Sequence, residues 1–183
     1  MRSQPIASTA NMPTAAIRTR SPSPKKLNED LLRRDFTMNA IAYHPKEGFR
    51  DPFHGQEDIA AGIIRGVGEP AKRFQEDALR MLRCVRFSAQ LGFAIDPETW
   101  AALCANTALI QKISAERIRE ELQKLWLAPF AKKMPLLWES GLLAQIDATL
   151  SASLIANSRT LFGGNFPLCP KDSILRWCIV LQY

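Results

Sequence analysis

The spacing of hydrophobic and polar positions changes along the chain, from loose alternation near the amino end to a helical repeat further on. Residues 36–43 alternate loosely and are rich in residues that favour strands, so they predict a β-strand. Residues 63–67 predict a second, buried strand. Between these two, the expected elements are a turn, a short strand and a helical turn, at 44–48, 49–50 and 55–61.

From residue 70 onward, apolar side chains recur every three or four positions, which is typical of amphipathic helices. Asp96 before Pro97, and Ser114 shortly before Glu116, are typical of helix starts. The expected helices cover residues 70–91, 97–107, 114–127, 130–140, 142–156 and 171–183. A little β-structure followed by many helices predicts an α+β fold.

The composition is that of an ordinary globular protein. Of the 183 residues, 46% are hydrophobic and 23% are charged, which is enough apolar material for a core and excludes wholesale disorder. No apolar run reaches the roughly 18 to 20 residues of a membrane span, so we expect no membrane partner. The cysteines form no C-x-x-C pair and have no histidine at ligand spacing. We therefore expect neither zinc nor a disulfide framework, but buried thiols in a reduced, cytoplasmic setting.

The net charge of +6 is unevenly distributed. Residues 1–26 contain five basic side chains and no acid, so residues 27–183 together carry only one positive charge in excess. The first segment is rich in Ser, Thr, Ala and Pro, and we interpret it as a disordered basic tail, with an organelle transit peptide as the less favoured alternative. A nucleic-acid site in the remainder must be a local patch.

The segment 76–87 predicts a helix with two different faces. At about 100° per residue, one stripe is apolar and should be buried, with Ala78, Met81, Leu82, Val85 and Ala89. A separate arc carries three arginines and two acids, namely Arg80, Arg83, Arg86, Glu76 and Asp77. Guanidinium groups one turn apart repel one another unless anions lie beside them, so this face suits phosphates or base edges.

Asp77 and Arg80 stand three positions apart, which would place an acceptor beside a forked donor. Such a pair can present a hydrogen-bonding edge to a planar heterocycle, much as a nucleic-acid base does. The alternative is a solvated amphipathic helix whose charges form intrahelical ion pairs, which is how most charge runs behave.

Two further groups of polar residues precede this helix. Arg33, Arg34 and Asp35 stand directly before the first predicted strand, where they can clamp a phosphate and accept a hydrogen bond from a ribose hydroxyl. The alternative is a surface cluster of ion pairs. Asp51 and Asp58 are interpreted as turn and cap acids that brace the fold.

Three segments stand together in order: RRDFTMNA at 33–40, DPFHGQED at 51–58 and EDALRMLRCVRF at 76–87. Together they resemble the bacterial-type (class II) tRNA nucleotidyltransferase and poly(A) polymerase family, which includes the CCA-adding enzymes. The resemblance runs from about residue 27 to at least residue 127. It implies part of a polymerase-β-like nucleotidyltransferase head, with short strands, followed by an all-α neck.

The resemblance also implies roles for the residues of the three motifs. Residues implied to contact the nucleotide are Arg34, Asp35, Asp77, Arg80, Arg83 and Arg86. Residues implied to support them are Arg33, Asn39, Asp51, Gly55, Asp58 and Glu76. In this interpretation the 34–35 pair senses the ribose, and Asp77 with Arg80 reads the base edge of CTP or ATP. The last two arginines contact phosphates, and the 51–58 segment couples the movements of head and neck.

One part of the family pattern is absent. The chemistry of such enzymes requires a glycine-rich turn for the triphosphate and an Asp-x-Asp pair for two magnesium ions. The sequence contains no Asp-x-Asp, and directly adjacent acids point to opposite faces of a strand and cannot replace it. We therefore expect no catalytic residue and no metal ligand in this chain, and Mg²⁺ bound elsewhere in the intact enzyme.

These observations predict how the chain is organised. Residues 1–26 form the tail, 27–68 the C-terminal part of the head, 69–157 a helical neck that recognises the nucleotide, and 158–183 the start of a helical body. Relative to the family, we expect truncation at the amino end and also at the carboxyl end.

The expected function follows from that organisation. The chain would be part of an RNA nucleotidyltransferase that adds CMP or AMP to the 3′ end of tRNA or another RNA and releases pyrophosphate. It would supply base and ribose recognition and be inactive alone. The alternatives are a catalytically inactive nucleotide- or RNA-binding remnant and a generic helical interaction domain.

Overall fold

The computed structural model of the chain describes residues 24–160 and 172–181. Its α-helices are α1 (Pro24–Leu32), α2 (Gly55–Ala61), α3 (Pro70–Glu76), α4 (Leu79–Leu91), α5 (Pro97–Asn106), α6 (Ala115–Trp126), α7 (Leu136–Glu139), α8 (Leu142–Ile146), α9 (Ala148–Thr160) and α11 (Ser173–Leu181). Its 3-10 helices are η1 (Thr37–Asn39), η2 (Thr107–Lys112) and η3 (Ala131–Lys133). Its strands are β1 (Ala42–His44), β2 (Gly48–Arg50), β3 (Ile63–Ile64) and β4 (Ala94–Ile95).

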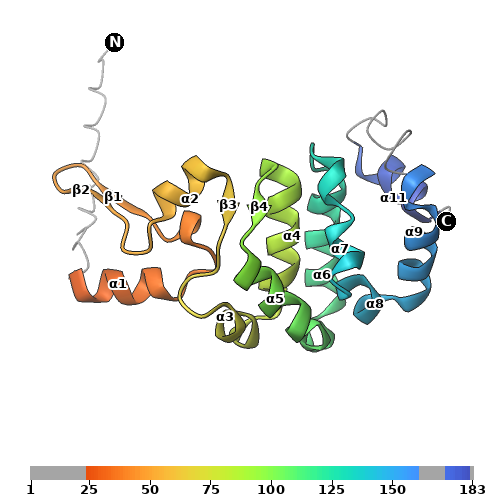
Figure 1. Cartoon of the computed structure of the whole chain (residues 1–183), viewed down its shortest axis with the longest axis horizontal. Helices are drawn as coiled ribbons and strands as arrows, with labels where there is room; N and C mark the ends of the chain where they lie inside the picture. Colours follow the sequence, from red (N-terminus) through yellow and green to blue (C-terminus); the bar gives the residue numbers. More distant parts are fainter. Residues whose placement is uncertain (1–23, 161–171, 182–183) are drawn as a thin grey trace, which may run out of the picture.

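The elements form an elongated row, with α1, β1 and β2 at one end and α9 and α11 at the other (Figure 1). β1 and β2 pair antiparallel, with Ala42 opposite Arg50, and β3 and β4 pair parallel, with Ile63 opposite Ala94. The prediction of an α+β fold, with a few short strands before many helices, is confirmed. β4 is a strand within the segment expected to be all-α.

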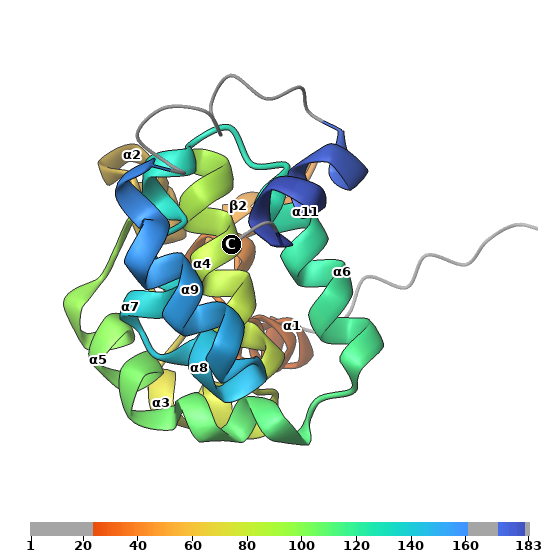
Figure 2. The ribbon, with the colours of Figure 1, turned by 90° about the vertical axis from the view of Figure 1, so that its right-hand side faces the viewer.

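Helix α4 supplies the centre of the core. The predicted apolar stripe is confirmed, because its five members are all buried: Ala78, Met81, Leu82, Val85 and Ala89. This stripe belongs to one cluster that extends from Phe36 to Val180. The rings of Trp126 on α6 and Trp177 on α11 meet edge to face, with their centroids 5.7 Å apart. This contact ties the last described helix to α6, beside which it lies in Figure 2.

The helix predicted over residues 70–91 is broken, so that prediction is wrong. α3 ends at Glu76, and α4 begins at Leu79, with Asp77 in an extended conformation between them (φ −148°, ψ 104°). The Asp77 Oδ1 atom accepts a hydrogen bond from the Leu79 N–H at 3.1 Å. Such a local bond from an aspartate competes with the helical backbone and favours a helix start. The two acids therefore do not share a helix with the three arginines.

The strand predicted over residues 36–43 is also wrong in its first half. The Asp35 Oδ1 atom accepts hydrogen bonds from the Phe36 N–H and the Asn39 side-chain amide, each at 2.9 Å. These bonds fold the first half of the predicted strand into η1. Only the end of the predicted strand, at residues 42–43, lies in β1. Residues 24–26, placed in the tail by the sequence, form the start of α1.

Other boundaries differ because of single residues. The helix expected over 142–156 is interrupted at Asp147, whose Oδ1 atom accepts from the Leu150 N–H at 2.9 Å and so starts α9. The helix expected over 130–140 is divided into η3 and α7, which begins after Pro135. The helix α2 has the predicted bounds.

The described cysteines are Cys84, Cys104 and Cys178, all free, whereas Cys169 lies outside the described residues. Burial, followed by the charge of Asp35, raises the pKa of the Cys84 thiol far above its usual value, so this thiol stays protonated. Cys178 is exposed, and the expectation of buried thiols therefore holds for Cys84 but not for Cys178. Among the described helices, none has the length and hydrophobicity needed to cross a lipid bilayer.

Candidate functional site

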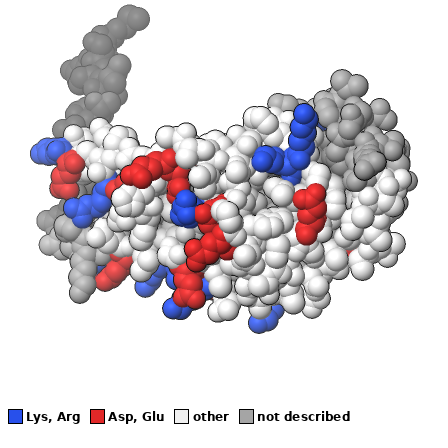
Figure 3. All heavy atoms as spheres, viewed as in Figure 1, with Lys and Arg blue, Asp and Glu red and all other residues white. Residues whose placement is uncertain are grey.

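A pocket of about 480 Å³ lies where the segment after α1 meets α4 and α6. Its lining residues are Arg33, Arg34, Asp35, Asn39, Asp77, Leu79, Arg80, Arg83, Phe87 and Arg117. Five arginines and two aspartates give this lining a formal excess of three positive charges. On the face seen in Figure 3, by contrast, basic and acidic side chains are interspersed. The positive charge is thus a local patch, as the sequence predicts.

Asp35 is the most firmly held acid of the pocket, with 8% of its surface exposed. Besides the two bonds at Oδ1 that form η1, its Oδ2 atom binds Arg83 at 2.6 Å from Nη2 and 2.8 Å from Nε. The backbone carbonyl of Asp35 accepts a hydrogen bond from the Val67 N–H at 3.2 Å. Arg83, 48 positions further along the chain, is therefore fixed beside the first motif, at residues 33–40.

Arg34 belongs to the same motif and also lines the pocket. Its Nη2 atom lies 3.1 Å from Asp30 Oδ2 on α1, and both side chains are more than half exposed. A solvated pair of this kind adds little to stability, so the guanidinium is available to an anionic ligand.

Asp77 and Arg80 both line the pocket but bind other partners rather than each other. Asp77 Oδ2 lies 3.0 Å from Arg117 Nη2 on α6. Arg80 donates to Glu76 Oε2 at 3.0 Å and to the backbone carbonyl of Arg33 at 2.7 Å. The Asp77 carboxylate and the Arg80 guanidinium therefore lie in one cavity, as expected. They are not on one helix, however, because the break between α3 and α4 separates Asp77 from Arg80.

Arg86 is not part of this pocket. Its side chain is 9% exposed, lies over the Phe87 ring and binds Glu121 Oε2 on α6 at 2.6 Å. Gln90 accepts a second hydrogen bond from it at 2.6 Å. The structure thus places Arg86 in a buried link between α4 and α6, which offers no support for the predicted phosphate contact.

The 51–58 motif lies outside the pocket and braces the segment that leads into it. The two oxygens of Asp51 accept from the backbone N–H groups of Gly55 and Gln56, both at 2.8 Å. Desolvation raises the pKa of Asp51, but these hydrogen bonds outweigh it and hold the pKa below its usual value. A Cβ atom at Gly55 would lie 2.2 Å from the carbonyl oxygen of Thr37, so only glycine fits this contact.

Asp58 connects this motif with the helices that follow. It accepts a hydrogen bond from the Thr37 hydroxyl at 2.7 Å and binds Arg65 Nε at 3.2 Å. Arg65 Nη1 lies 2.6 Å from Asp96 Oδ1, and Asp96 caps α5 through the Thr99 N–H at 3.1 Å. An ion-pair chain therefore spans the boundary that the sequence predicts between head and neck.

Three members of the pocket are not among the residues predicted from the sequence: Leu79, Phe87 and Arg117. Phe87 could have been found from the helical repeat, because it stands four positions, or about one turn, after Arg83 on the same helix. Its ring lies 5.3 Å from the Arg83 guanidinium. Arg117 gives no local signal, since it stands 40 positions away from its partner Asp77.

Within 24–160 and 172–181, no group of three or more His, Cys, Asp or Glu side chains is arranged to hold a metal ion. What the pocket offers instead is cations for phosphates, two carboxylates and one aromatic ring.

Two segments of the chain match known domain families. Residues 4–65 match the poly(A) polymerase head domain, and residues 92–150 match the probable RNA- and SrmB-binding site of polymerase A. The first match begins at residue 4, within the predicted basic tail. The two matches flank the helix that carries Arg80 and Arg83.

The CCA-adding enzyme of Geobacillus stearothermophilus is 53% identical to the chain over 123 residues, which are 67% of this chain and 30% of that protein. The CCA-adding enzyme of Anoxybacillus flavithermus is 46% identical over 156 residues, or 84% of this chain and 38% of that protein. The chain thus spans about a third of the length of these relatives.

Solved structures show the same likeness. The Bacillus stearothermophilus CCA-adding enzyme in complex with CTP is 55% identical, with a TM-score of 0.62 over 63% of this chain and 30% of that one. The Thermotoga maritima CCA-adding enzyme complexed with tRNA, at 23% identity, shares the fold with a TM-score of 0.62 over 85% of this chain and 44% of that one. The chain therefore belongs to the tRNA nucleotidyltransferase and poly(A) polymerase family, of which the CCA-adding enzymes are members.

Proposed function

We propose that this chain is the base- and ribose-recognition part of an RNA nucleotidyltransferase and that its pocket binds CTP or ATP. The intact enzyme adds CMP or AMP to the 3′ end of tRNA or another RNA and releases pyrophosphate. One observation carries the proposal: a single positively charged pocket gathers Asp35, Asp77, Arg80 and Arg83, which come from two separate motifs.

The chemistry of the pocket explains why cytosine and adenine would be accepted. Both bases present an exocyclic amino group next to an unprotonated ring nitrogen. A carboxylate accepts from the amino group while a guanidinium donates to the ring nitrogen, which is the pair that Asp77 and Arg80 supply. Guanine and uracil present a carbonyl next to an N–H at the same edge, so each contact would be reversed.

The other half of the pocket suits the sugar and the phosphates. The Asp35 carboxylate can accept from a ribose hydroxyl in place of one of the two donors that Arg83 directs at Oδ2, because the Arg83 side chain is 33% exposed. Arg33 and Arg34 lie on the same side, where their guanidinium groups can meet the triphosphate.

Mg²⁺ is part of the proposal for the intact enzyme but not for the described residues. When bound, it aligns the attacking hydroxyl and disperses the charge of the transferred phosphate. The described residues bind and orient the nucleotide, and they include no cluster of three or more metal-ligating side chains. A cytoplasmic setting, and the division into a tail at 1–26, a head portion at 27–68, a neck at 69–157 and the start of a body at 158–183, belong to the same proposal.

The proposal is tested by binding of the four nucleoside triphosphates to the 183-residue chain, measured by NMR titration. We expect CTP and ATP to bind more tightly than UTP and GTP, with shifts at the arginine side-chain signals of the pocket. Equal binding of all four would contradict base recognition.

A second measurement is the incorporation of labelled CMP or AMP into tRNA that lacks its 3′ end. Because the sequence has no Asp-x-Asp pair, we expect no incorporation by this chain alone. Magnesium-dependent incorporation would contradict the assignment of this chain to nucleotide recognition without catalysis.

A further inference from the structure

Arg117 is a member of the pocket that belongs to none of the three sequence motifs. We propose that Arg117 is a positioning residue for base selection, which holds the Asp77 carboxylate in the orientation that reads the base. The inference rests on the proposed function, because it assigns the selectivity of the same pocket to a second helix.

The backbone alone does not fix the Asp77 side chain. Asp77 is extended between α3 and α4, so no helix surrounds it, and 33% of its side chain is exposed. The Leu79 N–H holds Oδ1 at 3.1 Å, and Arg117 Nη2 holds Oδ2 at 3.0 Å. One bond would leave the carboxylate free to rotate, whereas two bonds fix its plane. Each oxygen keeps a further acceptor site for an amino group of a base.

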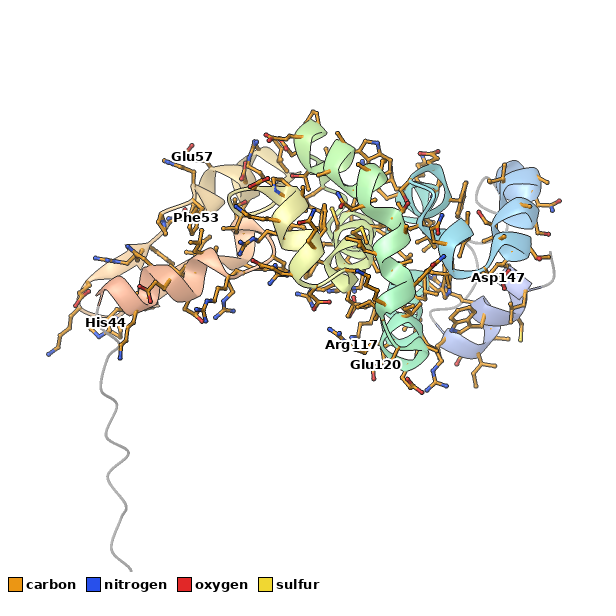
Figure 4. The ribbon with its side chains drawn as sticks, turned by 90° about the horizontal axis from the view of Figure 1, so that it is seen from below. His44, Phe53, Glu57, Arg117, Glu120 and Asp147 are labelled. Atoms are coloured by element: carbon orange, nitrogen blue, oxygen red, sulfur yellow. The ribbon has the colours of Figure 1, made fainter. Side chains whose placement is uncertain are left out.

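The helix that carries Arg117 is itself held in place. Glu121 lies one turn after Arg117 on α6, and its buried contact with Arg86, at 2.6 Å, fixes that turn against α4. Figure 4 shows Arg117 on α6, at the surface seen from below. The buried pair thus places Arg117 opposite the break between α3 and α4, where Asp77 stands. This gives Arg86 a role in the pocket without a contact to the nucleotide.

The Arg117–Asp77 pair is suited to selectivity rather than to folding stability. Half of the Arg117 side chain is exposed, and exposed ion pairs add little to the free energy of unfolding. A nucleotide in the pocket would exclude water from the pair and strengthen it, because charges attract more strongly at low dielectric constant. Loss of Arg117 should therefore leave the fold intact and change the binding of nucleotides.

A direct contact between Arg117 and the triphosphate would have a different consequence. Every nucleoside triphosphate carries the same phosphates, so loss of such a contact would raise the dissociation constants of all four nucleotides by the same factor. Loss of a residue that orients Asp77 weakens CTP and ATP more than UTP and GTP. The ratio of dissociation constants therefore separates the two roles.

The experiment compares the wild-type chain with Arg117→Ala, Arg117→Lys and Arg119→Ala by NMR titration with each of the four nucleotides. Arg119 is the matched control, since it is an exposed arginine on α6 outside this pocket. We expect Arg117→Ala to reduce the preference for CTP and ATP by about fivefold, the worth of one partly exposed charge-assisted hydrogen bond. The preference of Arg117→Lys for CTP and ATP should lie between those of the wild type and Arg117→Ala, because lysine keeps the charge but lacks the planar fork of arginine.

Unchanged selectivity in Arg117→Ala, or an equal loss for all four nucleotides, would overturn the inference while leaving the proposed function intact. A wild-type chain without preference among the four nucleotides would instead overturn the proposed function. A thermal melt of each variant shows whether the fold is retained.

Discussion

Two arginines on α4, one turn apart, show how burial decides what the same chemistry does. Arg83 binds Asp35 with 33% of its side chain exposed, and Arg86 binds Glu121 with 9% exposed. A partly solvated guanidinium can accept a new anion at little cost. A buried pair cannot be opened without leaving a charge in a poorly solvated place. One helix thus divides its arginines between a pocket and a structural link.

The comparison predicts the largest loss of stability at the buried pair. Arg86→Ala would leave the Glu121 carboxylate buried beside a half-exposed Lys124, which compensates only in part. We expect the free energy of unfolding to fall by about 3 kcal/mol, as for other broken buried pairs. Urea denaturation followed by circular dichroism measures it.

The control for this prediction replaces both partners. In Arg86→Met/Glu121→Leu no charge is stranded, so most of the lost stability should return. A double variant as unstable as Arg86→Ala would show that shape, rather than charge, holds α4 and α6 together at this point.

A second large effect on stability is expected at Gly55, where a steric contact and not a charge determines the cost of substitution. A methyl group there would meet the Thr37 carbonyl oxygen at 2.2 Å, which forces η1 and α2 apart. We expect Gly55→Ala to cost about 1–3 kcal/mol, the usual cost of overpacking. Ala60→Ser, at an exposed position of α2, is the matched control, and similar midpoints of denaturation for the two variants would contradict the close contact.

The sequence predicted the location of the site better than its geometry. The apolar stripe of α4 follows the helical repeat, so the core face of this helix could be found from spacing. The pocket residues, in contrast, were assigned to the nucleotide through the resemblance of three short motifs to a known family. The break at Asp77 could not be found from spacing, because the helical repeat of the surrounding residues continues through it. Only the hydrogen bond from the Leu79 N–H reveals why the helix stops.

The positions of Arg86 and Arg117 could not be predicted from the sequence either: Arg86 was expected in the pocket and lies outside it, and Arg117 was not expected there and lines it. On a helical wheel Arg86 is equivalent to Arg80 and Arg83, and only the packing of α6, with Glu121, buries it. Arg117 enters the pocket because α6 lies against α4, although its own helix carries no motif. Contacts between residues far apart in the sequence therefore decided both cases.

Two of the pocket arginines, Arg80 and Arg83, should affect nucleotide binding in different ways. Arg80→Lys removes the fork and keeps the charge, so it should reduce the preference for CTP and ATP over UTP and GTP. A bidentate contact to a base edge is worth about 1–3 kcal/mol of discrimination. Arg83→Ala should weaken all four nucleotides to a similar degree. Calorimetric titration measures both, and an equal effect of Arg80→Lys on every nucleotide would contradict its contact with the base.

The smallest effect is expected outside the pocket, at Asp51, where an ionised acid binds two backbone N–H groups of α2. Its pKa is lower in the folded chain than in the unfolded one, so its stabilising contribution is present above the unfolded value, near 3.8, and is lost as the pH falls through the folded value. Asp51→Asn should therefore lower stability at pH 7 by less than about 1 kcal/mol, as for other cap residues. Denaturation at pH 7 and in the acid range below that value checks the sign. The difference between wild type and Asp51→Asn should shrink in acid, and a difference that grows would show that Asp51 is not stabilised as a carboxylate.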